Sequence, residues 1–250
     1  MKKYAVSLVL LFLVNSALAQ TPDTAKSNGA SAAKSSSTAP PAITDKSTPV
    51  ELARAALTAL GGENFKKLKS SMVIGSVNLY APSQTQSIPG TFAIVTAGDK
   101  VRIDINAQPV AVFKQIYDGQ RSFSNIPGVE VPPPSKFGLP VLAKFDQPGY
   151  TVTALPDKKK MRGFRIVDSE GNTTDYYIDP TTAQISEYVI PYNGYTFGSS
   201  ISKFKEIDGV MVPTSFTQRF ELPIGAYFAE YKVKDVKLNQ PIGDDVFVIK

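Results

Sequence analysis

The 250-residue sequence contains no cysteine, no histidine and no tryptophan. Without cysteine there can be no disulfide and no cysteine lipidation, so the core alone must hold an exported protein together. Without cysteine and histidine, the usual tetrahedral zinc site and all histidine-based acid–base machinery are excluded. An enzyme would have to work with carboxylates, lysine, serine or tyrosine. We therefore expect no metal, no cofactor and no catalytic residues.

The excess of positive over negative charge is also small. The formal net charge is +5, and Lys2 and Lys3 supply two of these charges. The densest basic run, residues 158–160, lies between Asp157 and Arg162, which is typical of a solvated turn between strands. This mild excess does not indicate a nucleic-acid partner.

The first residues have the pattern of a secretory signal peptide. Lys2 and Lys3 precede an apolar run over residues 4–14, and a small-x-small site ends at Ala19. The apolar run is too short for a comfortable membrane span of about 20 residues. We therefore expect residues 1–19 to be cleaved, which leaves a soluble, non-lipidated periplasmic protein.

Residues 20–47 consist largely of serine, alanine, threonine, proline and lysine. Such a segment cannot bury enough apolar surface to offset its ordering entropy, so it is predicted to be a disordered tether. The remaining residues, 48–250, are predicted to form a single domain.

The domain begins with a helix signal. Thr48-Pro49-Val50-Glu51 is a capping box with proline at the first helical position. The apolar residues that follow fall mostly on one helical face, and Gly61-Gly62 supplies a stop. The short amphipathic helix is expected to pack its apolar face against another part of the domain.

After Lys69 the hydrophobic period changes to two, which indicates strands. The clearest case is Val101, Ile103 and Ile105, which alternate with polar residues. Similar runs are separated by short turn signals, so about ten strands are predicted in an antiparallel meander. They cover residues 72–80, 91–96, 112–117, 150–154, 163–167, 174–178, 185–190, 197–207, 210–221 and 226–238.

One long connection, residues 126–147, breaks this rhythm and is called the insert below. Three consecutive prolines, Pro132 to Pro134, exclude a central strand. The insert is too apolar for a solvated loop, so one or two short helices broken near Pro140 are predicted, acting as a lid. Its apolar residues are Phe137, Leu139, Val141, Leu142 and Phe145.

Several motifs, taken in order, resemble the LolA/LolB-like superfamily of outer-membrane lipoprotein-sorting proteins. The first is the hairpin Tyr117-Asp118-Gly119-Gln120-Arg121-Ser122-Phe123. Three C-terminal motifs follow: Asp179-Pro180-Thr181-Thr182, then Asp208-Gly209-Val210-Met211-Val212-Pro213, then Asn239-Gln240-Pro241-Ile242-Gly243-Asp244-Asp245-Val246-Phe247. Together they span most of residues 50–250.

The resemblance implies a mainly β (α+β) fold: an incomplete antiparallel β-barrel, or half-barrel, with short helices packed on its concave face. It also implies non-enzymatic binding of acyl chains or other apolar groups there. The carriers proper have an Arg-Pro-type turn after the first hairpin, and that arginine latches the lid. The equivalent turn here, residues 97–100, has neither residue. The fold is therefore implied more strongly than lipoprotein delivery.

Three function classes remain open. The first is a monomeric periplasmic carrier of a lipid, acyl chain or other apolar ligand, whose partners would be that ligand and an envelope membrane complex. The second is an envelope interaction module that uses a sheet face or edge. The third, an enzyme, is disfavoured because no acids converge; Asp244 and Asp245, for example, point to opposite sides of an extended chain. The candidate groove and lid residues are Val101, Ile103, Ile105, Phe137, Leu139, Val141, Leu142 and Phe145.

Overall fold

The computed structural model describes residues 41–126, 128–222 and 225–249. The predicted signal peptide, 1–19, and most of the predicted tether, 20–40, lie outside the described residues. Within the described part of the chain, no helix is both long and apolar enough to cross a membrane.

The first helix, α1 (Pro49–Ala59), begins at the predicted capping box. The Glu51 N–H donates to Thr48 Oγ1 at 3.3 Å, and the Thr48 N–H donates to Glu51 Oε2 at 2.7 Å. The helix ends at Leu60, and Gly61 then adopts a φ of +116°. A side chain at Gly61 would meet the Gly209 carbonyl oxygen at 2.4 Å, so only glycine fits there. A one-turn helix, α2 (Glu63–Lys66), follows.

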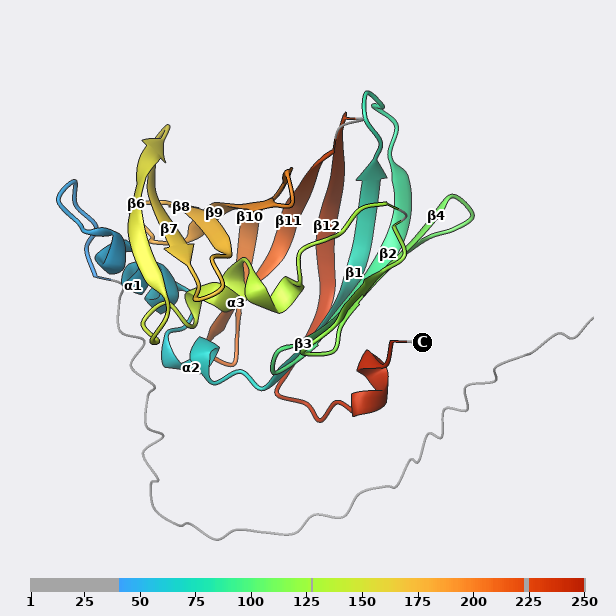
Figure 1. Cartoon of the computed structure of the whole chain (residues 1–250), viewed down its shortest axis with the longest axis horizontal. Coiled ribbons are helices and arrows are strands. Elements are labelled where there is room, and N and C mark those ends of the chain that lie inside the picture. Colours follow the sequence, from blue (N-terminus) through green and yellow to red (C-terminus); the bar gives the residue numbers. More distant parts are fainter. Residues whose placement is uncertain (1–40, 127, 223–224, 250) are drawn as a thin grey trace, which may run out of the picture. The chain divides into compact units, whose positions relative to one another are not determined.

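Twelve strands form one antiparallel sheet in the order β5-β4-β3-β2-β1-β12-β11-β10-β9-β8-β7-β6. The sheet is not closed, and in Figure 1 it curls around the segment that contains α3. The expected half-barrel is therefore confirmed. Strand β5 was not among the strands predicted from the sequence, because its three residues are too few to show a period of two. The strands are β1 (Ser70–Tyr80), β2 (Ile88–Ala97), β3 (Lys100–Ala107), β4 (Ala111–Tyr117), β5 (Ser122–Ser124), β6 (Thr151–Lys158), β7 (Met161–Val167), β8 (Thr173–Ile178), β9 (Ile185–Tyr192), β10 (Tyr195–Ile207), β11 (Val210–Leu222) and β12 (Gly225–Leu238).

The strand register separates the two faces of the sheet. Ile105 pairs with Phe92 on β2 and with Phe113 on β4, so these side chains share a face. Arg102 faces the other way and donates to the Val246 carbonyl oxygen at 3.1 Å. Beside Val246, the C-terminal 3-10 helix η2 (Asp244–Phe247) buries Phe247 against that outer face. The insert and α1 lie on the opposite, concave face.

The insert forms two short helices, η1 (Pro134–Lys136) and α3 (Leu139–Leu142). The break falls at Phe137 and Gly138, while Pro140 lies in the first turn of α3, where it costs no hydrogen bond. Within the core, the Tyr176 hydroxyl donates to the Gly138 carbonyl at 2.6 Å. The Gly138 N–H donates to Thr174 Oγ1 at 3.2 Å.

Three surface ion pairs also hold the insert. Lys136 Nζ lies 2.6 Å from Glu170, and Lys144 Nζ lies 2.8 Å from Asp99. Lys66 of α2 lies 2.6 Å from Asp146. The insert is thus tied at both ends to neighbouring turns and helices.

Residues 41–47, the end of the predicted tether, pack against the domain. Ile43 joins the core beneath α1, and the Arg162 guanidinium donates to the carbonyl oxygens of Thr44 and Ser47. Residues 41–47 thus contact the domain, and a domain that begins at residue 48 stays a prediction.

Candidate functional site: the concave face of the sheet

One end of the concave face is covered by the protein's own helices and is called the filled half. Its floor is the inner face of β6–β9, and α1 and α3 pack on it. Leu142 of α3 and Tyr176 of β8 are both fully buried there. The buried members are Leu52, Ala53, Ala56, Leu57, Leu60, Val141, Leu142, Phe145, Phe164, Ile166, Tyr176, Ile178 and Ile185.

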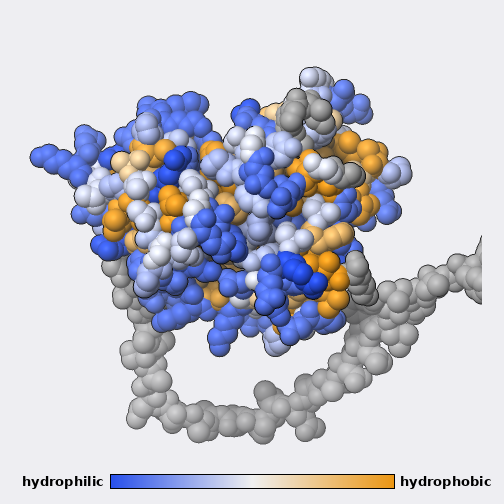
Figure 2. All heavy atoms as spheres, viewed as in Figure 1, coloured by the Kyte–Doolittle hydropathy of each residue, from blue (hydrophilic) through white to orange (hydrophobic). Residues whose placement is uncertain are grey.

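The other end, called the open half, is the concave face of β1–β4, β11 and β12. Its apolar cluster consists of strand residues alone, and among the described residues no helix or insert residue belongs to it. Five members are buried and eight keep part of their surface exposed: Val77, Phe92, Ile105, Ala229 and Tyr231, then Val73, Leu79, Ile94, Ile103, Phe113, Phe216, Phe220 and Val233. In Figure 2 a large hydrophobic patch lies at the end of the molecule that holds β2 and β4.

Aromatic rings form a fixed floor in the open half. Phe216 stacks on Tyr231 with ring centroids 4.6 Å apart, and Phe92 meets Tyr231 edge-on at 4.9 Å. A side chain at Gly75 would meet Phe92 Cε1 at 2.8 Å, so glycine at this position lets Phe92 lie across β1. Such edge-on and offset pairs add to the stability that burial alone provides.

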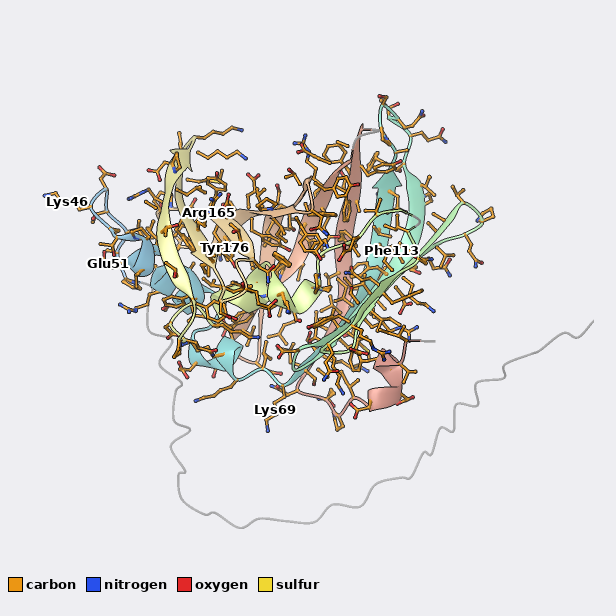
Figure 3. All side chains as sticks on the ribbon, viewed as in Figure 1. Lys46, Glu51, Lys69, Phe113, Arg165 and Tyr176 are labelled. Carbon is orange, nitrogen blue, oxygen red and sulfur yellow. The ribbon has the colours of Figure 1, made fainter. Side chains whose placement is uncertain are left out.

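A third cluster lies where the two halves meet. Phe137 of the insert packs with Val131, Ile190 and Phe197, and meets Tyr192 edge-on at 5.4 Å. On the β4 side, the Gln115 side-chain amide donates to the Pro132 carbonyl at 2.9 Å. The insert therefore spans the concave face between the two ends of the sheet. Tyr176 and Phe113 mark the two halves in Figure 3.

The structure does not bring the eight candidate residues together in one site. Ile103 and Ile105 belong to the open half. Phe137 lies in the third cluster, where the two halves meet. Val101 is buried but belongs to none of these three clusters. The other four insert residues, Leu139, Val141, Leu142 and Phe145, pack into the filled half.

Val77, Phe92 and Tyr231 are buried residues of the open half that were not among the predicted site residues. Val77 lies in the predicted strand 72–80, and the period of two in that strand indicates which of its side chains share a face. Its pairing with Tyr231, however, joins distant parts of the chain, and no local pattern reveals it.

On β3 the charged side chains Arg102 and Asp104 alternate with Ile103 and Ile105, so they face away from the open floor. Arg165 and Asp175 pair on the outer face, with Arg165 Nη2 2.8 Å from Asp175 Oδ2. Within the described residues, no group of three or more histidine, cysteine, aspartate or glutamate side chains could hold a metal ion. Burial raises the pKa of Tyr188 and of Tyr231, so both phenols are neutral near pH 7. The floor therefore offers apolar contact and uncharged hydrogen-bonding groups.

A surface cavity of about 470 Å³ lies elsewhere, between residues 41–47 and α1. Lys46, Glu51 and Arg54 contribute to its lining. Glu51 is already engaged in the capping box, so this cavity reflects how the N-terminal segment crosses the helix.

No protein-family model matches the sequence, and no curated protein is significantly similar to it. Solved structures do match. A LolA superfamily protein from Nitrosomonas europaea has a TM-score of 0.50 at 13% identity, over 78% of this chain and 97% of the other. A DUF1329 family protein from Desulfovibrio piger has a TM-score of 0.51 at 11% identity, over 81% of this chain and 98% of the other. The fold implied by the sequence motifs is thus confirmed, and the chain has a divergent LolA-like fold.

Proposed function

We propose that the protein is a non-enzymatic periplasmic carrier or binder of an apolar ligand, such as a lipid or acyl chain, held in the open half. The observation that carries this proposal is the apolar floor of β1–β4, β11 and β12, on which no described helix packs. Apolar surface of this kind on a soluble protein commonly marks a binding site. The LolA-like fold of the neighbours supports the same function.

A long chain is the ligand that suits such a floor. Burying apolar surface gives about 0.8 kcal/mol per methylene, so affinity grows with chain length. The half-buried residues Ile94, Ile103 and Phe113 offer contacts along neighbouring strands. A small polar ligand would gain little there.

The insert acts as the lid in this proposal. Exposing Phe137 and Leu142 would cost about 2 kcal/mol each, and the buried hydrogen bonds of Gly138 would also break. Binding in the open half needs none of this. We therefore propose that ligand enters the open half first, and that a long chain displaces the insert only if it reaches the filled half.

Adjacent residues on β4 provide a matched test. Phe113 faces the open half, and Val112 is exposed on the outer face. Replacing Phe113 with serine should weaken binding of a fluorescent fatty-acid probe, while Val112→Ser should leave it unchanged. Lipid extracted from the purified wild type and identified by mass spectrometry should carry an acyl chain. Absence of any bound lipid, together with equal probe binding by both variants, would exclude the carrier function.

The alternative is an envelope interaction module, and β6 is the feature that favours it. β6 ends the sheet, and most of its residues are exposed. However, Pro156 and Lys158 lie on this strand, and both residue types discourage edge pairing. A folded protein that binds no lipid, but is co-purified with an envelope protein and loses it when β6 is altered, would favour this alternative.

A further inference from the structure

Four polar side chains lie side by side on the concave face, at the boundary between the two halves. Ser199 of β10 pairs with Tyr188 of β9 on one side and with Gln218 of β11 on the other. Directly paired residues point to the same face, so the three form a row across the sheet. Tyr231 lies two residues along β12 from Ala229, the partner of Gln218. These four residues are called the polar stripe.

Two members of the polar stripe are buried among apolar neighbours. Ser199 is 4% exposed and Tyr231 is 2% exposed, while Phe197, Phe216 and Phe220 flank them on the same face. Desolvation raises the pKa of Tyr231, and the nearby Tyr188 phenol adds to this rise. The two phenols thus share one poorly solvated environment.

The hydrogen-bonding capacity of the polar stripe is not used up by the protein. The hydrogen bond of the Tyr188 phenol is with the Ser199 hydroxyl, within the same group, and a hydroxyl or side-chain amide can form more than one hydrogen bond. Tyr188 and Gln218 keep part of their surface exposed, whereas Ser199 and Tyr231 are almost fully buried beside them. Tyr176, the next residue in the row, differs because it donates to the Gly138 carbonyl.

We propose that the polar stripe is the subsite for an uncharged hydrogen-bonding group, an ester, amide or hydroxyl, carried by an acyl-chain ligand. This inference rests on the proposed function and adds the chemical class of the ligand's polar part. The hydroxyls and the Gln218 amide can donate to a carbonyl oxygen, and Gln218 and the hydroxyls can also accept from a ligand hydroxyl. The acyl chain then extends over Phe92 and Phe216.

Charge decides between ligand classes. The polar stripe contains no lysine, arginine or carboxylate, so nothing in it would compensate an ionised ligand group. Burying an unpaired charge costs far more than burying an ester. A monoacylglycerol should therefore bind more tightly than the ionised fatty acid of the same chain length.

The test uses two probes on the full mature chain. Diphenylhexatriene is a pure hydrocarbon and reports the apolar floor, whereas monolauroylglycerol, which displaces it, also reports the polar stripe. Tyr188→Phe and Tyr231→Phe should each weaken monolauroylglycerol binding by about threefold to tenfold, the usual value of one hydrogen bond. Diphenylhexatriene binding should not change. Tyr177→Phe is the matched control, because Tyr177 neighbours Tyr176 on β8 and faces outward.

The outcomes separate the two proposals. If the hydrocarbon probe binds and both tyrosine variants bind monolauroylglycerol like the wild type, the polar stripe is not a subsite, although the floor still binds ligand. Equal affinity for ionised laurate and monolauroylglycerol would overturn the uncharged class. If neither probe binds the folded wild type, the proposed function itself fails. Circular dichroism checks that each variant is folded.

Discussion

The two halves of the concave face are built alike and covered differently. Both present alternating apolar side chains from one continuous sheet, but α1 and α3 pack on β6–β9 and on Ile201, Phe204 and Met211 of β10 and β11, and not on the open half. Leu142 in the filled half is fully buried, whereas Ile103 in the open half keeps part of its surface exposed. The filled half therefore contributes mainly to stability. The open half leaves comparable side chains available for binding.

The largest expected effect tests this division directly. Leu142→Ala should lower the free energy of unfolding by about 3 kcal/mol, because it leaves a cavity between α3, α1 and the sheet. Ile103→Ala should cost less, about 1 kcal/mol, because part of this side chain is already exposed to solvent and a smaller cavity is left. Urea denaturation of both variants measures this difference. Equal losses would mean that the two halves are packed alike.

A second variant removes one hydrogen bond from the filled half. Tyr176→Phe keeps the ring that stacks on Phe164 at 5.0 Å but removes the donor to the Gly138 carbonyl. An unpaired buried carbonyl should cost about 1–3 kcal/mol. Hydrogen exchange at residues 138–142 should rise together with this loss. Tyr177→Phe, on the outer face of the same strand, is expected to change neither quantity.

A smaller effect is expected from the surface ion pair between Lys144 and Asp99, which ties α3 to the β2–β3 turn. The Asp99 side chain is 65% exposed, so Lys144→Ala should change stability by less than about 1 kcal/mol. If this contact holds the insert, the variant should accept fluorescent fatty acid faster in stopped-flow mixing. An unchanged uptake rate would show that ligand enters the open half without movement at this end of the insert.

The smallest effect concerns pH. A hydrogen bond from Lys66 lowers the Asp146 pKa below its ordinary value of 3.8. Since the folded pKa is depressed, the pair stabilises the fold above pH 3.8, and this contribution is lost as the pH falls further. Lys66→Met should therefore flatten the acid limb of a stability–pH curve. Lys67→Met should leave it unchanged, because Lys67 is exposed and its one partner is the equally exposed Glu63.

Local patterns in the sequence predicted the local parts of this fold. The capping box at Thr48, the alternation at Val101, Ile103 and Ile105, and the helices of the insert all depend on neighbours along the chain. The division of the concave face depends instead on where α1 docks and on which strands become neighbours. For that reason Val141 and Ile105, two aliphatic residues that were both predicted to line the site, belong to different halves.

The pairing of β1 with β12 also determines when the open half can form during folding. Every other neighbouring pair in the sheet consists of consecutive strands, whereas Tyr80 of β1 donates to Glu230 of β12, 150 residues later. Contacts so distant in sequence form slowly, because a long loop must close before they provide any stabilisation. The floor takes Val77 and Phe92 from one side of this seam and Tyr231 from the other. A partly folded chain therefore has no complete floor, and the proposed ligand site can form only after β12 has docked on β1.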